Sequence, residues 1–352
     1  MGWSPHWQGL IALHAAAGRI AGRVIRGDRT SSLVATANGI VRAGTTARLL
    51  KADESHAALP VVGDWVALSV PDGDGAALIE AVLARRNAIV RSDAGRTAEV
   101  QALAANVDTV FVVHPIADEP NLRRLERELS VAWSSGATPV VVLTKSDLSA
   151  DAEAAREAVA SVAIGVEILT VNGLDGASVG GLLEHVAAGR TAILLGPSGA
   201  GKSTLINALL GEQRQATGGI READGRGRHT TVARELVAIP GHGVIIDTPG
   251  LRAIGLTGDE DGIALAFPDI EALAPSCRFR DCRHGDEPDC AVRAAVEAGE
   301  LDPERLASWH KLQRELQVAA VKTDARARAE EHRKGRIMGR VIKDYHKKSG
   351  RP

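Results

Sequence analysis

The sequence has few cysteines, few aromatic residues and almost no net charge. Three cysteines are too few, and odd in number, for a disulfide framework, which favours a reducing compartment. The 42 basic residues against 44 acidic ones give a net charge of −2, so any binding of nucleic acid must come from local patches. With one tyrosine and three phenylalanines in 352 residues, stacking on bases is not the expected mode of such binding.

Long hydrophobic runs are also missing, since no uncharged apolar stretch reaches the roughly 18 residues of a membrane helix. The first basic residue is Arg19, so the basic segment of a signal peptide is lacking, and His6 stands where a myristoylation signal needs Ser or Thr. We therefore expect a cytoplasmic protein without a membrane partner. A hydrophobic content of 45% indicates globular domains, two or three of them at this length.

The pattern along the chain predicts several units. Residues 1–17 are rich in alanine and stay unassigned. Short β-branched segments between Asn-Gly or Asp-Gly turns fill residues 18–92 and predict a small all-β barrel or sandwich. Over residues 98–256, near-continuous apolar runs alternate with helical segments, which is typical of a parallel α/β sheet. Residues 261–320 hold the cysteines and then helical patterns, and a basic tail covers 321–352.

A phosphate-binding loop is the strongest motif. The pattern G-x-x-x-x-G-K-S/T is matched in full between an expected strand, 192–195, and an expected helix, 204–210. Lys202 should reach the β- and γ-phosphates, and the Ser203 hydroxyl should bind Mg²⁺. The alternative is a glycine-rich turn with a chance lysine. The expected nucleotide-binding residues here are Gly196, Pro197, Ser198, Gly199, Ala200, Gly201, Lys202, Ser203 and Thr204.

Two further segments could complete the phosphate site. Asp247 ends an apolar strand, where P-loop proteins place a second Mg²⁺ group, and Gly250 can offer its N–H to the γ-phosphate. Taken alone, this segment could be an ordinary turn. The glycine-rich stretch 225–231 suits a switch loop that orders on γ-phosphate and Mg²⁺, with Thr231, or failing that Thr230, as metal ligand and catalytic residue.

The segment Thr144-Lys145-Ser146-Asp147 resembles the guanine-reading motif of GTPases. A carboxylate at Asp147 can accept hydrogen bonds from guanine N1–H and the exocyclic amine, a pair that adenine does not offer. Thr144 replaces the usual Asn, which could loosen bonds between loops. The alternative is a helix cap, because Ser146 and Asp147 are good capping residues. The following base-contact segment, Thr170-Val171, matches the GTPase pattern poorly.

The order of these motifs is rotated, because the guanine reader precedes the phosphate loop, whereas in Ras-like GTPases it follows. Such an order looks like a circularly permuted GTPase, which a parallel sheet tolerates because its ligand site consists of loops at the strand ends. Leu251 stands where Ras-like enzymes carry the water-orienting glutamine, so we expect slow hydrolysis unless a partner completes the site. His229 is the candidate for orienting water, with a solvated or RNA-facing loop histidine as the alternative.

All three cysteines fall in one stretch with the pattern C-x₄-C-x-H-x₅-C, formed by Cys277, Cys282, His284 and Cys290. Three thiolates and one imidazole predict a structural Zn²⁺ site, against the alternative of free cysteines beside a surface histidine. The same loop carries three arginines suited to phosphates. A helix is expected from Asp302-Pro303 to about residue 320. Residues 322–352 hold 11 Lys or Arg against 4 acids, so we favour RNA contact over a merely solvated tail.

Together, the barrel, the rotated motifs and the zinc pattern over about residues 18–320 resemble the ribosome small subunit-dependent GTPase A family of bacteria. The segments 101–108 and 227–231 look like family signatures too. The resemblance implies an OB-fold barrel, a circularly permuted GTPase domain, and GTP hydrolysis stimulated by the small ribosomal subunit late in its maturation. Thr144 and Thr170-Val171 depart from the family pattern.

Three functions remain open at this point. The first is a GTPase that docks on ribosomal RNA and leaves after hydrolysis. The second is an ATPase or small-molecule kinase, against which Asp147 argues. The third is an RNA-binding protein with a vestigial or regulatory nucleotide site, against which intact Lys202, Ser203 and Asp247 argue. No heptads or apolar stripe call for a dimer, so we expect a monomer.

Overall fold

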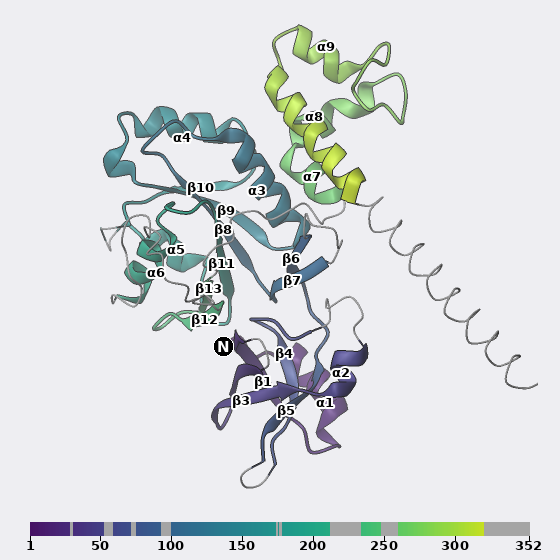
Figure 1. The fold of residues 1–352 in the computed structure, drawn as a ribbon. Helices are drawn as coiled ribbons and strands as arrows, with labels where there is room; N and C mark the ends of the chain where they lie inside the picture. Colours follow the sequence, from purple (N-terminus) through teal and green to yellow (C-terminus); the bar gives the residue numbers. More distant parts are fainter. Residues whose placement is uncertain are drawn as a thin grey trace, which may run out of the picture.

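The structure is a computed structural model, and it has three parts: a β-barrel, an α/β sheet and a helical C-terminal module (Figure 1). Among the helices of the described ranges, none has the length and apolar character needed to cross a bilayer. The described residues are 1–28, 31–52, 59–71, 75–92, 100–173, 175, 178–211, 234–247 and 260–319.

The first part is a closed five-stranded barrel. The strands pair in the order β1-β2-β3-β5-β4, and β4 returns to pair with β1. Alternate side chains fill its interior, with Val24, Val34, Val66, Leu68 and Ile79 fully buried. The expected small OB-like barrel is thereby confirmed. Its elements are β1 (Ile20–Gly27), β2 (Ser31–Thr36), β3 (Gly39–Thr45), α2 (Ala47–Ala52), β4 (Trp65–Ser69) and β5 (Ala77–Val82).

The unassigned N-terminal segment forms α1 (Pro5–Ala15), which packs on the barrel. Pro5 starts the helix after Ser4, as proline does at a first helical turn. Trp7 is buried against Trp65 with ring centroids 6.0 Å apart, and Ile11 joins the same cluster. The helix therefore adds an outer apolar layer to the barrel, a role that its alanine-rich composition did not reveal.

The second part is the expected parallel sheet, with strands β10, β9, β8, β11 and β13 side by side and parallel. β11 is buried throughout, as its run of apolar residues predicts. The strands are β8 (Thr109–Pro115), β9 (Thr138–Thr144), β10 (Glu167–Thr170), β11 (Thr191–Leu195), β12 (Glu235–Ala238) and β13 (Val244–Asp247). The helical segments are α3 (Leu122–Ser134), η1 (Ser146–Leu148), α4 (Ala152–Ala160), α5 (Gly180–Glu184) and α6 (Lys202–Leu210).

Barrel and sheet meet in two places, along β12 and at the start of β11. The antiparallel strand β12 pairs with both β13 and β1, which joins the two parts in one hydrogen-bonded sheet. Arg23 of the barrel is buried and donates to the Thr191 hydroxyl at 2.8 Å and to the Gly63 carbonyl at 3.2 Å. A separate hairpin, β6 (Ala88–Ser92) with β7 (Val100–Ala105), precedes β8.

The third part is helical and packs on α3 of the sheet region. It comprises α7 (Glu260–Ala266), α8 (Pro268–Leu273), η2 (Ala274–Ser276), α9 (Ala291–Glu297) and a helical segment over 303–319. Helices α7 and α3 approach closely at Gly262, where an added Cβ would lie 1.8 Å from the Ser134 hydroxyl. As expected, the strands end before this module within the described residues.

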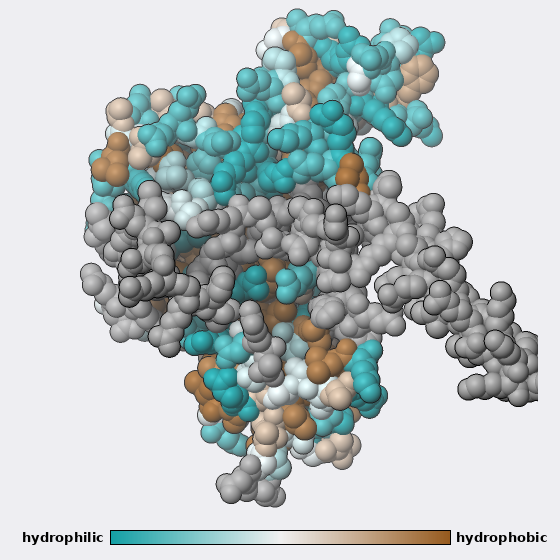
Figure 2. Space-filling view, viewed as in Figure 1, coloured by the Kyte–Doolittle hydropathy of each residue, from teal (hydrophilic) through white to brown (hydrophobic). Residues whose placement is uncertain are grey.

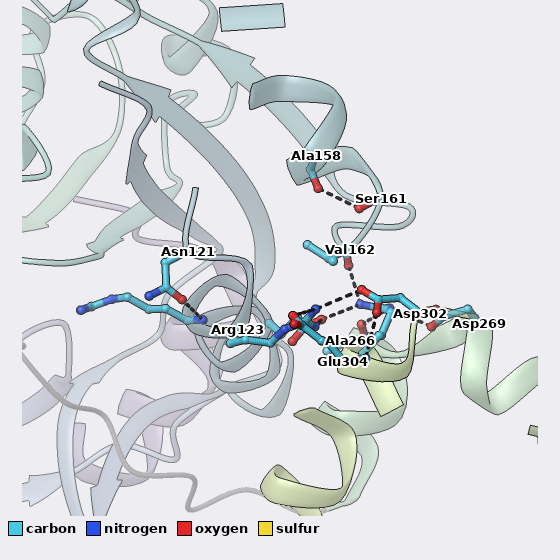
Figure 3. Close-up of polar contacts among 12 residues, drawn as sticks. Asn121, Arg123, Ala158, Ser161, Val162, Ala266, Asp269, Asp302 and Glu304 are labelled. Carbon is cyan, nitrogen blue, oxygen red and sulfur yellow. Dashed lines mark hydrogen bonds and ion pairs between the residues drawn. The ribbon is translucent and has the colours of Figure 1, made fainter. Parts of the chain in front are cut away.

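A buried ion-pair network fixes this module to α3. Arg305, 3% exposed, donates to Glu126 of α3 at 3.1 Å and to Asp269 of α8 at 2.8 Å. Arg123 also binds Glu126, at 2.7 Å, and reaches Asp302 and Glu304 at 3.2 Å. Figure 3 shows Arg123, Asp269, Asp302 and Glu304 of this network where the helical module meets α3. Glu126 is fully buried, and both arginines donate hydrogen bonds to its carboxylate.

We expect Arg305→Ala to destabilise the contact between α3 and the C-terminal module by about 3 kcal/mol, because it leaves a buried carboxylate with one partner fewer. This change is measured by urea unfolding, with hydrogen exchange of the α8 amides as the readout. The matched control is Arg156→Ala, whose ion pair with Glu153 at 3.6 Å is exposed and should contribute below about 1 kcal/mol. Equal effects of the two substitutions would contradict the assignment.

Candidate nucleotide and metal sites

The phosphate-loop motif has the backbone conformation that such a loop needs. Gly196 has φ 142°, and an added Cβ there would lie 2.2 Å from the Val113 carbonyl oxygen, so only glycine fits. Gly199 and Gly201 also have positive φ, of 80° and 92°. Helix α6 begins at Lys202, two residues earlier than the sequence predicts, so Lys202 and Ser203 lie in its first turn. A loop of this conformation at a helix N-terminus is suited to binding phosphate.

The ammonium of Lys202 is held inside this loop. Its Nζ donates to the carbonyl oxygens of Gly196 and Pro197, at 2.8 and 2.7 Å. Burial lowers the pKa of Lys202, and the carboxylate of Glu128 opposes that shift more strongly than Asp247 does. The lysine is therefore a positive charge placed at the loop, with acidic groups of α3 and β13 near it.

The guanine-reading segment and the phosphate loop are joined directly. Thr144 ends β9, and its hydroxyl donates to the Ala200 carbonyl at 2.6 Å, across 56 residues of sequence. Threonine here bonds the two loops together, which differs from the loosening expected for a replacement of Asn. Lys145 has a left-handed φ of 60°, and Asp147 lies exposed in η1. The Ser146 hydroxyl reaches the Val171 carbonyl at 3.5 Å, so the next strand end is close as well.

The helix-cap alternative for this segment is wrong. Neither Ser146 nor Asp147 caps a helix with its side chain, because both lie inside the short helix η1, whose N-cap residue is Lys145. The following helix α4 is capped by Asp151, which accepts from the Ala154 amide at 2.9 Å. The Asp147 carboxylate therefore serves no cap and faces solvent at the strand ends.

The remaining candidates fall into two groups. Asp247 ends β13, next to β11, so it lies at the same carboxyl edge of the sheet as Ser203 and Thr144. The second group lies outside the described residues and keeps its status as prediction: His229, Thr230, Thr231, Gly250 and Leu251.

Helix α3 contributes side chains to this region that the sequence analysis missed. Arg124 and Glu128 form an ion pair at 2.9 Å, and burial raises the pKa of Glu128 while Arg124 opposes the rise. His114, on β8, accepts a hydrogen bond from the Asn121 amide at 3.1 Å, and burial lowers its pKa to about 4. The i, i+4 spacing of Arg124 and Glu128 was the available sequence signal.

The three cysteines and His284 converge in the C-terminal module, with all four ligand atoms within 4.8 Å of one another. The Sγ atoms of Cys277 and Cys290 are 3.9 Å apart, and His284 Nδ1 lies 3.6 and 3.5 Å from them. A tetrahedral ion with normal Zn–S and Zn–N bonds requires separations of about 3.8 Å and about 3.5 Å. Burial also lowers the pKa of His284, which favours the neutral imidazole that a metal binds. The cluster thus fits zinc.

Comparisons with known proteins agree with this arrangement. The sequence profile of the family described as RsgA GTPase matches residues 82–257. The protein named small ribosomal subunit biogenesis GTPase RsgA from Streptomyces coelicolor is 47% identical over 347 residues, which cover 97% of this chain and 93% of that protein. The protein of the same name from Opitutus terrae is 47% identical over 95% of this chain and 94% of its own length.

Solved structures show the same fold. The chain matches YjeQ from Thermotoga maritima with a TM-score of 0.63 and 26% identity, over 85% of this chain and 99% of that one. It also matches YloQ, described as a circularly permuted GTPase, with a TM-score of 0.60 and 22% identity, over 85% and 95% of the two chains. The rotated motif order, the closed barrel and the Cys₃His cluster therefore have one explanation. This chain belongs to the RsgA GTPase family.

Proposed function

We propose that this chain is a GTPase that binds the small ribosomal subunit and acts late in its maturation. The observation that carries the proposal is the hydrogen bond from Thr144 to Ala200, because it joins a guanine-reading segment to a phosphate loop. The curated relatives are named GTPases of small ribosomal subunit biogenesis. Such a partner would place this protein in the cytoplasm, and we expect it to act there as a monomer.

The site residues have the following roles in this proposal. Lys202 neutralises charge on the β- and γ-phosphates, and the loop amides of residues 196–203 bind the remaining oxygens. Ser203, Thr231 and Asp247 would hold Mg²⁺, which would neutralise negative charge on the phosphates. Lys145 and Asp147 select guanine, and Gly250 contacts the γ-phosphate. His229 orients the attacking water.

We also propose a division of the chain that serves this function. The barrel occupies residues 18–92 after an N-terminal extension, and the GTPase domain occupies residues 98–256. The zinc-bearing helical domain covers residues 261–320, and the basic tail 321–352 contacts ribosomal RNA.

Asp147→Asn tests guanine recognition and subunit binding in one experiment. The substitution removes a charged acceptor for two guanine donors, so we expect GTP affinity to fall by roughly a hundredfold or more. Xanthine carries a carbonyl in place of the exocyclic amine of guanine. The side-chain amide of the new Asn can donate a hydrogen bond to that carbonyl, so affinity for xanthosine triphosphate should rise. The Asp147→Asn chain should therefore co-sediment with purified small subunits in the presence of a non-hydrolysable xanthosine triphosphate analogue, but not with the guanosine analogue.

The controls separate the competing functions. The unaltered chain should co-sediment with the guanosine analogue and dissociate with GDP. A chain that binds ADP as tightly as GDP would be an ATPase or kinase instead. If affinity for the subunit is the same with every nucleotide and without one, the result would favour an RNA-binding protein with a vestigial nucleotide site.

A further inference from the structure

An exposed aromatic ring stands out in the zinc loop, defined here as residues 277–290. Phe279 is 41% exposed, and among the described residues its ring contacts no other aromatic ring. The other aromatic side chain of comparable exposure, Trp3, packs against Trp65 at 4.8 Å. Figure 2 shows a mainly hydrophilic surface over the C-terminal module. Single exposed apolar side chains are common, so the surroundings of this ring decide whether it can bind a partner.

The face of the ring has a cationic neighbour. The guanidinium carbon of Arg278 lies 5.5 Å from the ring centroid, within the range of a cation–π contact. Arg278 is fixed in turn by Asp289, through a side-chain bond of 2.8 Å and a backbone bond of 3.3 Å. Phe279 lies in the sequence between Cys277 and Cys282, and both cysteines belong to the metal cluster. One face of the ring is thus backed by a planar cation, on the loop that also carries the Cys₃His cluster.

The free charges beside this ring are two arginines and two aspartates. Arg280 and Arg283 are exposed, and within the described part of the chain neither has an ion-pair partner. Of the nearby acids, Asp289 is occupied by Arg278, and Glu287 binds the amides of Arg283 and Gly285. Asp281 and Asp286 stay exposed, so the attraction for phosphate is modest. Affinity at this loop must therefore come chiefly from the ring.

We propose that Phe279, backed by Arg278, is a stacking platform for one unpaired RNA base, with Arg280 and Arg283 beside the adjoining phosphates. Every base has a flat face, so one ring suffices without sequence preference. This inference rests on the proposed function for the source of the RNA. It also departs from the expectation drawn from composition, because a count of aromatic residues does not show that one ring is exposed on the zinc loop.

The test uses a single-stranded oligoribonucleotide that carries 2-aminopurine, whose fluorescence is quenched when the base stacks. The metal-loaded full chain at low salt should quench the probe. Phe279→Leu keeps the apolar volume but loses the flat face, so it should abolish the quench and weaken probe binding about 5- to 150-fold. Phe279→Trp should retain both. Leu265→Ala, at a residue of the same module that is 51% exposed, is the control without effect.

The salt dependence of small-subunit binding gives a second, independent measurement. Phe279→Leu should weaken binding and leave the salt slope unchanged, whereas Arg280→Ala should lower the slope by about 0.7 for one lost phosphate contact. Zinc content verifies that each variant keeps its loop.

The outcomes distinguish this inference from the proposed function. If Phe279→Leu quenches and binds like the unaltered chain, the ring does not stack on the base and the platform is disproved. If the unaltered chain fails to quench the probe, the platform is equally disproved, even where subunit binding holds. If quenching depends on Phe279 but the chain does not bind small subunits, the platform is supported and the proposed function is rejected.

Discussion

Removal of zinc is expected to unfold the zinc loop and α9 while the nucleotide site stays folded. Metal binding to such clusters contributes roughly 10–16 kcal/mol, which equals or exceeds the about 5–15 kcal/mol of an entire domain. Cys290 is itself buried in the core with Val292 and Trp309, so loss of the ion also removes a packing anchor. Hydrogen exchange of the α9 amides during chelation, together with zinc content, measures the effect.

The same experiment contains its own control. Helix α7 packs on α3 through Gly262 and does not depend on the ligands, so its amides should lose less protection than those of α9. Nucleotide affinity should be unchanged, because the phosphate loop belongs to the sheet. Cys282→Ser should reproduce the effect of chelation. Protection of α9 that persists after the metal has gone would show that the cluster is not structural.

Addition of small ribosomal subunits is expected to raise GTP turnover by up to about 10⁵-fold, the size of a partner's contribution to Ras. The expectation rests on the sequence prediction that Leu251 occupies the position of the water-orienting glutamine, because a leucine side chain cannot hydrogen-bond a water molecule. Such a factor corresponds to about 7 kcal/mol of barrier. Single-turnover rates of GTP hydrolysis with and without purified subunits provide the measurement.

Lys202→Ala is the matched variant for this experiment. Loss of a preorganised charge at the phosphates should lower the stimulated rate by about 10²–10³-fold or more, while zinc content and the fold of the C-terminal module stay intact. Equal rates with and without subunits would argue against a subunit-dependent enzyme. A fully active Lys202→Ala chain would show that hydrolysis takes place elsewhere.

The sequence alone determined the features that depend on local pattern. The parallel strands and the convergence of Cys277, Cys282, His284 and Cys290 were predicted and are confirmed, because each is encoded by residue types at fixed short spacings. The phosphate-binding role of residues 196–204 stays a prediction. The boundaries were less accurate: α6 starts at Lys202 instead of Thr204, since a positive-φ glycine at 201 lets the helix begin at the lysine.

Only the tertiary structure decided which distant residues meet. The bond from Thr144 to Ala200 spans 56 positions, and the pair of Arg305 and Glu126 spans 179. The packing of α1 on the barrel likewise depends on Trp65, far along the chain from Trp7. No local spacing encodes such contacts, because they arise from how buried surfaces and buried charges find partners once the elements have folded together.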